Sequence, residues 1–344
     1  MLFFDVGFCK PMNERTKIVV VGAGRFGQQH ARVYHELPEA ELVGVFDTDP
    51  QRAAEVAEQF QCRKFASLEE LIGAVEAASV AVPTEKHAEI GQKLLEAGID
   101  VLVEKPMARS VAEADLLIAA AEKGQRVLQV GHLERFNPAV EAARAIVRSP
   151  LFFEAHRLSV FTPRSLDVDV VLDLMIHDLD IVLSLVDSAP EEVRGVGLPV
   201  LTPKVDIANV RLSFQNGCVA NFTASRVSTE RVRKLRWFQP REYISVDYAR
   251  QDATVTTVEL NGPQPVLSHR RLEPPKEEPL KRQLADFLKN VRERRSPSVG
   301  GKEGKRALRL AHQIVEEIGR HSDRLQKSYS WESLVPILTA KESG

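Results

Sequence analysis

Apolar residues in the first third of the chain alternate between two spacings. Short apolar runs rich in β-branched residues predict strands at Lys17–Val21, Glu41–Phe46, Ala78–Val82, Asp100–Val103 and Arg126–Val130. Segments with helical spacing lie between these runs, the first of them at Arg25–Glu36. Strands that alternate with helices in this way predict a parallel sheet that is covered on both faces.

Helix start signals agree with this alternation. Three of them follow one another along the chain: Asp49 before Pro50, Ser67 with Glu70, and Ser110 with Glu113. An Asp before a Pro predicts an N-cap and a proline at the first helical position, where no backbone donor is lost. A Ser followed three residues later by Glu predicts a capping box. We therefore expect helices to begin near residues 50, 68 and 111.

The spacing changes after Gly131. A predicted helix at Pro138–Arg148 leads to a strand at Phe152–Phe161 and a long helix at Val168–Val186. Seven further strands are predicted at Glu192–Leu198, Ala208–Phe214, Val219–Arg226, Arg231–Phe238, Tyr243–Tyr248, Thr254–Glu259 and Val266–Leu272. Helices at Pro279–Arg294 and Lys302–His321 follow. Short turns join several of the strands, which predicts a mostly antiparallel, open-faced sheet in an α+β domain.

The chain thus divides into three parts. We expect residues 1–15 to form a flexible extension, residues 16–132 a doubly wound Rossmann domain, and residues 133–344 a second domain. The second domain would bind substrate and form oligomer contacts, and its last helices would pack back on the first domain. The fold class is α/β with an additional α+β domain.

Composition narrows the function classes. Of 344 residues, 44% are hydrophobic and 27% are charged, values typical of globular proteins. Lys and Arg number 46 against 48 Asp and Glu, so a nucleic-acid partner is disfavoured. No apolar run approaches the roughly 20 residues that a membrane span needs. The sparse cysteines Cys9, Cys62 and Cys218 favour a reducing compartment, and we expect a cytoplasmic location.

The first predicted strand runs directly into Gly22-Ala23-Gly24-Arg25-Phe26-Gly27, a G-x-G-x-x-G sequence. The first glycine permits a tight turn, the second lets the backbone approach a pyrophosphate, and the third allows close packing of helix on strand. The helix that follows presents free amide groups and a positive dipole end to phosphates. Because the motif lies between a strand and a helix, it predicts a dinucleotide site.

Asp47 ends the second predicted strand and indicates which dinucleotide binds. A carboxylate at this point accepts hydrogen bonds from both ribose hydroxyls and repels a 2′-phosphate. Thr48 and Asp49, which follow, offer no arginine for that phosphate. NAD is therefore favoured over NADP, although Asp47 could instead only start a turn.

Two sequences supply candidate acid–base groups. Lys105 lies in Glu104-Lys105-Pro106 at the end of the fifth predicted strand, the edge at which a doubly wound sheet binds ligands. Asp173 and His177 have the i, i+4 spacing that puts two side chains on one helix face. A histidine can accept the proton of an alcohol that loses hydride. The alternatives are a surface lysine, a core histidine, or half of a metal site; with no further ligands nearby, we expect no metal.

Together these motifs resemble the glucose-fructose oxidoreductase, inositol dehydrogenase and MocA-like family over residues 16–320. The resemblance implies NAD as cofactor and a homodimer or homotetramer formed through the second domain's sheet. It implies cofactor-binding residues at Gly22, Gly24, Arg25, Phe26, Gly27, Asp47, Pro83, Thr84, His87, Glu104 and Lys105. It also implies that Lys105 and His177 act on the substrate hydroxyl, with Asp173 in support. Accounts of the proton acceptor vary within the family; we favour His177, with Lys105 polarising the oxygen.

Two segments narrow the substrate. Residues 131–138 and 168–186 resemble the branch of the family that oxidises UDP-N-acetylglucosamine and related nucleotide sugars at the 3-hydroxyl. The resemblance implies a downstream aminotransferase and a place in lipid A or surface-polysaccharide synthesis. A diphosphate requires cations and hydrogen-bond donors, and we expect Arg135, Asn137, Arg157 and Arg164 to border the crevice and bind it. The charged strand Arg231–Arg236 predicts one solvated face, a structural or oligomer surface.

Three alternative functions stay open. A dehydrogenase of a free sugar or an inositol would use the same chemistry and would not need the arginines. A non-catalytic NAD-binding sensor would share the fold, but the presence of Lys105, Asp173 and His177 disfavours it. A scaffold built on the second sheet would leave the glycine motif unexplained.

Overall fold

The computed structural model describes residues 15–162, 168–260 and 264–328, so the expected extension lies almost wholly outside the described residues. The chain forms two compact units. Unit 1 contains the chain up to Leu133 together with Glu278–Lys305, and unit 2 contains Glu134–Glu277 together with the chain from Arg306. In the described part of the chain, no helix is both long enough and apolar enough to span a bilayer.

Unit 1 is built on a six-stranded parallel sheet in the order β3-β2-β1-β4-β5-β6. Its strands are β1 (Thr16–Val21), β2 (Ala40–Phe46), β3 (Arg63–Lys64), β4 (Ala77–Val80), β5 (Asp100–Glu104) and β6 (Leu128–Gly131). The strand order reverses between β1 and β4, so right-handed crossovers from these strands place helices on both faces. This is the predicted doubly wound Rossmann sheet, and its fully buried β-branched strands explain why both faces must be covered.

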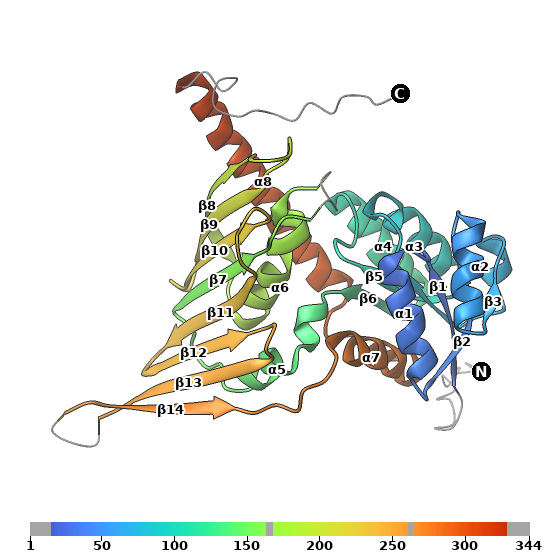
Figure 1. The fold of residues 1–344 in the computed structure, drawn as a ribbon, viewed down its shortest axis with the longest axis horizontal. Helices are drawn as coiled ribbons and strands as arrows, with labels where there is room; N and C mark the ends of the chain where they lie inside the picture. Colours follow the sequence, from blue (N-terminus) through green and yellow to red (C-terminus); the bar gives the residue numbers. More distant parts are fainter. Residues whose placement is uncertain (1–14, 163–167, 261–263, 329–344) are drawn as a thin grey trace, which may run out of the picture. The chain divides into compact units, whose positions relative to one another are not determined.

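Two of the helices of unit 1 begin at a side-chain cap, and Figure 1 shows where the helices of this unit lie. They are α1 (Arg25–Glu36), α2 (Pro50–Gln59), α3 (His87–Glu96), α4 (Val111–Gly124) and α7 (Pro279–Glu293), with short 3₁₀ turns η1 (Glu69–Leu71) and η2 (Thr84–Lys86). Asp49 caps α2 through the amides of Gln51 and Arg52, as predicted. Ser110 caps α4 by accepting from the amide of Glu113 at 3.1 Å, which confirms that prediction as well.

The helix predicted to start at Ser67 does not form. The chain makes only the turn η1, and the Ser67 side chain is not its cap. Glu70 instead pairs with Arg63, with 3.0 Å between Glu70 Oε2 and Arg63 Nη2. The helix α3, which we did not predict, begins at His87 and has no side-chain cap. The capping-box pattern of Ser67 and Glu70 thus produces only a short turn, and Glu70 is paired with the neighbouring strand β3.

Helix α7 comes from the end of the chain but completes the core of unit 1. Its buried Leu284, Phe287 and Leu288 lie in one apolar cluster with Ile18 and Val20 of β1. Helix α1 packs beside α7. Unit 1 is therefore discontinuous in sequence, because residues far beyond the sheet close one of its faces.

Unit 2 contains an eight-stranded sheet in the order β14-β13-β12-β11-β7-β10-β9-β8. Its strands are β7 (Phe152–Leu158), β8 (Pro190–Leu198), β9 (Ile207–Phe214), β10 (Val219–Ser225), β11 (Val232–Gln239), β12 (Glu242–Asp247), β13 (Asp252–Glu259) and β14 (Val266–Leu272). Only β7 and β10 pair in parallel, and the other pairs are antiparallel. The predicted mostly antiparallel sheet is thus confirmed.

One face of this sheet is covered and the other is open. The helices of unit 2 are α5 (Pro138–Arg144), α6 (Ile176–Leu185) and α8 (Gly301–Ser328), which starts within unit 1; η3 (Leu133–Phe136) precedes α5. Figure 1 shows these helices against one face of the sheet. Strand β7 alternates buried and half-buried residues, so Phe153 and Ala155 face the core while Phe152 and Glu154 face outward. Such alternation is expected of a half-covered antiparallel sheet.

The long helix predicted at Val168–Val186 contains a π-turn. Residues Val171–Met175 form this turn, η4, and the regular helix α6 starts only at Ile176, whose amide donates to the carbonyl of Val171. A π-turn inserts an extra residue into a helix and occurs frequently at functional sites. The spacing of apolar residues could not reveal it, because the turn keeps Val171 and Met175 buried.

We expect Phe287→Ala to destabilise unit 1 strongly, because it removes a fully buried ring from the contact of α7 with the sheet. The loss should be about 3–5 kcal/mol. Leu116→Ala on α4 is the control, since Leu116 is 53% exposed and should cost under about 0.5 kcal/mol. Urea denaturation followed by circular dichroism measures both. Equal midpoints for the two variants would show that α7 does not contribute to the core.

Candidate functional site

The glycine loop between β1 and α1 has the shape that a dinucleotide site needs. Gly22 has φ +99°, and a Cβ there would lie 2.5 Å from the carbonyl oxygen of Ala81. A Cβ on Gly27 would lie 1.7 Å from the carbonyl oxygen of Gly22. At Gly24, by contrast, an added Cβ would meet no atom within 4 Å. Contacts within the protein thus require glycine at positions 22 and 27, whereas Gly24 borders open space.

The start of α1 leaves its first amides for a ligand. Gly24 is the N-cap residue and supplies no side-chain acceptor, so the first turn lacks an internal cap. Arg25 and Phe26 are exposed beside it. An uncapped helix start next to open space fits the diphosphate of NAD, whose phosphate oxygens accept hydrogen bonds from such amides.

Asp47 lies at the end of β2, next to this loop. One carboxylate oxygen accepts from the amide of Ala23 at 2.7 Å, and the other accepts from the amide of Asp49 at 2.8 Å. Arg52 Nη1 lies 3.6 Å from Asp47 Oδ1. Each carboxylate oxygen has two lone pairs, so both can also accept from ribose hydroxyls. Asp47 therefore shapes the glycine loop as well as presenting a carboxylate to it.

Glu104 and its surroundings form a buried polar cluster beneath Lys105. His30 of α1 is fully buried, with Nδ1 2.6 Å from Ser79 Oγ and Nε2 3.4 Å from Glu104 Oε1. The other carboxylate oxygen of Glu104 accepts from the amide of Lys105 at 3.3 Å. A Cβ on Gly131 would lie 2.3 Å from Glu104 Oε1. The Glu104 side chain is thus held inside the unit, where it accepts from the backbone of Lys105, and its contact with cofactor stays a prediction.

His87 is also internal. Its Nδ1 lies 2.8 Å from the carbonyl oxygen of Pro106 and its Nε2 lies 2.9 Å from that of Val82. Burial lowers the pKa of His87, against the raising effect of these carbonyls. The ring links the turn after β4 to the turn after β5, and its contact with cofactor stays a prediction. Pro83 is exposed and Thr84 half-buried on the same turn, and their cofactor contact stays a prediction.

Asp173 and His177 lie in unit 2, on either side of the junction between the π-turn and α6. Both side chains are partly exposed. Their neighbours Val171, Met175 and Ile176 are buried in the core of unit 2. The apolar residues therefore direct one side of this segment into the core and leave Asp173 and His177 on the accessible side.

A buried ion-pair cluster lies next to His177. Arg157 of β7 donates from Nε and Nη2 to the two oxygens of Asp178, at 2.7 and 2.9 Å. Its Nη1 donates to Glu134 Oε1 at 2.9 Å, and its guanidinium carbon lies 5.0 Å from the centre of the Tyr248 ring. Burial alone would lower the pKa of Arg157, but the charges of Asp178 and Glu134 raise it well above its usual value. The arginine is therefore charged, and each of its three nitrogens donates to a carboxylate oxygen.

The predicted substrate ligands are therefore revised. Arg157 faces the core of unit 2 and donates from all three nitrogens to Asp178 and Glu134, so it is not kept as a ligand for a diphosphate. Asn137 is also buried: it caps α5 and donates to Glu134 and to the carbonyl of Tyr248. Arg135 is buried with Nε 3.5 Å from Asp180 Oδ2. Arg164 lies outside the described residues.

The sequence contained a signal for this cluster that we did not use. Asp178 and Asp180 stand at otherwise apolar positions of the predicted helix, and Glu134 precedes Arg135. Carboxylates on a core-facing surface require cationic partners, since unpaired buried charges are costly. That rule would have assigned Arg157 to the interior.

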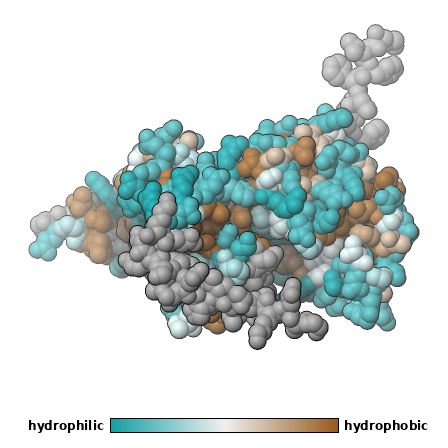
Figure 2. Space-filling model, turned by 90° about the horizontal axis from the view of Figure 1, so that it is seen from above, coloured by the Kyte–Doolittle hydropathy of each residue, from teal (hydrophilic) through white to brown (hydrophobic). Residues whose placement is uncertain are grey.

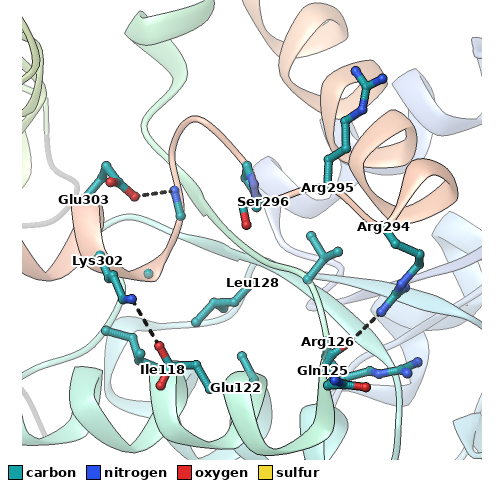
Figure 3. A pocket seen from close by; sticks show the side chains of 15 residues that line it. Ile118, Glu122, Gln125, Arg126, Leu128, Arg294, Arg295, Ser296, Lys302 and Glu303 are labelled. Carbon is teal, nitrogen blue, oxygen red and sulfur yellow. Dashed lines mark hydrogen bonds and ion pairs between the residues drawn. The ribbon is translucent and has the colours of Figure 1, made fainter. Parts of the chain in front are cut away.

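A hollow of about 900 Å³ in unit 1 is not a candidate for the same site (Figure 3). The loop from Arg294 to Glu303 and the start of β6 line it. Its cations are already engaged: Arg294 pairs with Asp100 at 2.6 Å and Lys302 with Glu122 at 3.3 Å. Among the described residues, no group of three His, Cys, Asp or Glu side chains is placed to hold a metal ion.

Comparison with known proteins gives matches over both parts of the chain. The model of an oxidoreductase family with an NAD-binding Rossmann fold matches residues 16–132. The model of the GFO/IDH/MocA C-terminal domain matches residues 140–240. These regions contain the glycine loop and the Asp173–His177 segment, respectively.

Individual relatives extend this likeness over most of the chain. UDP-N-acetylglucosamine 3-dehydrogenase of Acidithiobacillus ferrooxidans is 38% identical over 304 residues, which are 86% of this chain and 95% of that protein. A solved structure of that enzyme has a TM-score of 0.83 at 37% identity, covering 88% of this chain and 98% of its own. Myo-inositol 2-dehydrogenase of Thermotoga maritima is 27% identical over 86% of this chain and 94% of its own length. The chain therefore belongs to the GFO/IDH/MocA family of oxidoreductases, whose N-terminal domain is an NAD-binding Rossmann fold.

Proposed function

We propose that this oxidoreductase oxidises the 3-hydroxyl of a UDP-N-acetylglucosamine-type nucleotide sugar to a ketone, with NAD as the hydride acceptor. The proposal rests on the combination of the catalytic groups with the likeness to one relative. The chain has a complete dinucleotide loop, Lys105 and the Asp173–His177 pair, and it is 38% identical over nearly the whole length of an enzyme named for this reaction. A non-catalytic sensor would not need the three acid–base groups.

The proposed roles follow from the chemistry of each group. Oxidation of an alcohol removes a hydride from carbon and a proton from oxygen. Bound NAD takes the hydride. His177, partly exposed on the accessible side of its segment, would accept the proton, since an imidazole titrates near neutral pH. Lys105 would polarise the hydroxyl oxygen, and Asp173 would support His177 or a sugar hydroxyl.

A second candidate substrate is a free sugar or an inositol. The observation that favours it is the burial of Arg135, Asn137 and Arg157, which removes the described residues expected to bind a diphosphate. Arg164 is the one predicted ligand that remains. The relative from Thermotoga maritima named as an inositol dehydrogenase supports the same alternative. Both candidates use the same catalytic groups and differ only in what binds beyond the reacting ring.

The proposal includes assembly through the open face of the unit 2 sheet, as a homodimer or homotetramer. Aromatic side chains gather there: the ring of Phe238 lies 5.8 Å from that of Phe152 and 4.8 Å from that of Tyr243. At the tip of the β13–β14 ribbon, Leu260, Val266 and Leu267 are exposed, and Figure 2 shows hydrophobic atoms at that tip on the left. Exposed apolar patches of this kind favour protein contacts.

The remaining parts of the proposal concern the cell. A 3-keto nucleotide sugar has a carbonyl group that an aminotransferase can convert to an amine, so we place such an enzyme downstream, in lipid A or surface-polysaccharide synthesis. We place the reaction in the cytoplasm, in keeping with the scarce cysteines.

Absorbance at 340 nm tests the substrate directly. Purified protein is mixed with NAD and, in turn, UDP-N-acetylglucosamine, other UDP-sugars, free sugars and inositols. Reduction of NAD with UDP-N-acetylglucosamine alone is the expected result. Reduction of NAD only with free sugars or inositols would overturn the proposed nucleotide-sugar substrate and would still support the proposed oxidation of a hydroxyl group. No change in absorbance, from a protein that is shown to bind NAD, would contradict the proposed reaction for the substrates tested.

We expect His177→Ala to lower turnover by roughly 10²–10⁴-fold, because it removes the proposed proton acceptor. NAD affinity should stay within twofold of wild type, since the glycine loop is unchanged. Steady-state kinetics and fluorescence titration of NAD measure the two quantities. Turnover equal to that of wild type would remove His177 from the mechanism.

Two glycine substitutions should have opposite effects. In Gly24→Ala the new methyl group lies in open space, so the melting temperature without NAD should be unchanged. The affinity for NAD should fall, because the methyl group occupies the space through which the cofactor approaches the loop. Gly27→Ala meets the Gly22 carbonyl and should lower the melting temperature even without NAD. Calorimetry and NAD titration of both variants measure this. A drop in stability for Gly24→Ala would mean that the position is structural.

Asp47→Ser should weaken NAD binding and narrow its advantage over NADP, because the carboxylate that accepts from ribose and repels a 2′-phosphate is lost. Asp49→Ser is the control: it keeps a capping side chain for α2 and does not remove the Asp47 carboxylate. The ratio of kcat/KM for the two cofactors is the measurement. An unchanged ratio in Asp47→Ser would mean that the ribose is recognised elsewhere.

A further inference from the structure

The segment that carries His177 cannot be oriented by ordinary helix geometry alone. The π-turn at Val171–Met175 inserts an extra residue, so the direction of His177 relative to the chain before it depends on how the turn is held. Contacts on both sides of the turn hold it. They come from other elements of unit 2 and are polar.

The chain before the turn is fixed to the entry of β9 and to the end of β10. The amide of Val170 donates to the carbonyl of Val205 at 3.0 Å, and the amide of Val205 donates to the Asp169 carboxylate at 2.9 Å. Arg226, which follows β10, donates to the carbonyl of Val168 and lies 3.7 Å from Asp206. The turn therefore starts from a fixed point.

The chain after the turn is fixed by Arg157. Asp178 directly follows His177 and is 2% exposed, with both of its oxygens on the Arg157 guanidinium. In an α-helix, neighbouring side chains point about 100° apart because 3.6 residues complete a turn. Holding Asp178 therefore fixes the direction in which the helix backbone presents His177, about 100° around the helix axis.

We infer that Arg157 is a positioning residue for the reaction: through Asp178 it sets the orientation of His177. The inference rests on the proposed role of His177. The guanidinium suits this task because its planar fork meets a carboxylate through two parallel hydrogen bonds, which define an orientation as well as a distance. Glu134 accepts from the third nitrogen, Nη1, and so helps to hold the guanidinium in this orientation.

A lysine at position 157 would keep the positive charge and lose the fork. Arg157→Lys therefore keeps the charge and removes the paired geometry, and Asp178→Asn keeps the size of the side chain but loses one of the two acceptors, since an amide nitrogen cannot accept. Arg320→Lys is the matched control: Arg320 pairs with Glu317 on the surface of α8 and is 64% exposed. Each variant is made in the full chain and its melting temperature is recorded.

The kinetic readout is the split between kcat and KM. In Arg157→Lys and Asp178→Asn, kcat should fall about 10- to 100-fold, because small displacements of a catalytic group have effects of this order. KM for NAD should stay within twofold of wild type, and Arg320→Lys should match wild type in both. A lower melting temperature with unchanged kcat would overturn the inference, since it would make Arg157 a structural anchor only.

A second readout does not need the reaction. Histidine labelled at the ring carbon gives one signal for each of the nine histidines in the chain, and loss of a signal in His177→Gln identifies that of His177. Arg157→Lys should displace the His177 signal, while Arg320→Lys leaves it in place. An undisplaced signal would overturn the inference even if no sugar is oxidised. If Arg157→Lys fails to fold, Asp178→Asn decides the question by the same two readouts.

Discussion

A charge buried in protein is stable only when its donors and acceptors are satisfied, and this constraint organises unit 2. The guanidinium of Arg157 lies between β7, α6 and η3, and each of these elements contributes one member of the ion-pair cluster. Removing Arg157 would leave the buried carboxylates of Asp178 and Glu134 without their cation. The sheet, the helix next to the π-turn and the segment before α5 are therefore tied to one another more specifically than apolar packing alone would achieve.

The order of the elements was predictable because their periodicity has a simple physical origin. Strands buried on both faces, such as β4 and β5, appear as apolar runs, and Asp49 and Ser110 mark helix starts because a free amide needs an acceptor. Ser67 carried the same local signal without forming a helix. In the structure, Glu70 does not complete a capping box and pairs with Arg63 of β3. A local start signal shows that a segment can begin a helix, but the rest of the structure determines whether the helix forms.

The candidate site was predictable to the extent that it depends on backbone geometry. The glycine loop has the form that its sequence implied, since a positive φ and close packing leave room only for glycine at Gly22 and Gly27. Arginine and histidine were harder to place, because both types serve equally well inside and at the surface. Arg157 was expected to contact substrate and His87 cofactor, and the structure shows that both connect elements within their units. The π-turn could not be predicted, because an inserted residue leaves the apolar pattern of the helix intact.

The contribution of α7 to unit 1 also bears on how the chain is made. A ribosome that has released residues 16–133 has produced all six strands of the first sheet, but the apolar surface that Leu284 and Phe287 will cover is still exposed. The eight-stranded sheet of unit 2 must emerge before that cover arrives. Domains in general fold in order as they are synthesised. Here the core of the earlier unit is complete only after residues 279–293 have been made, and until then one apolar face of its sheet lacks its cover.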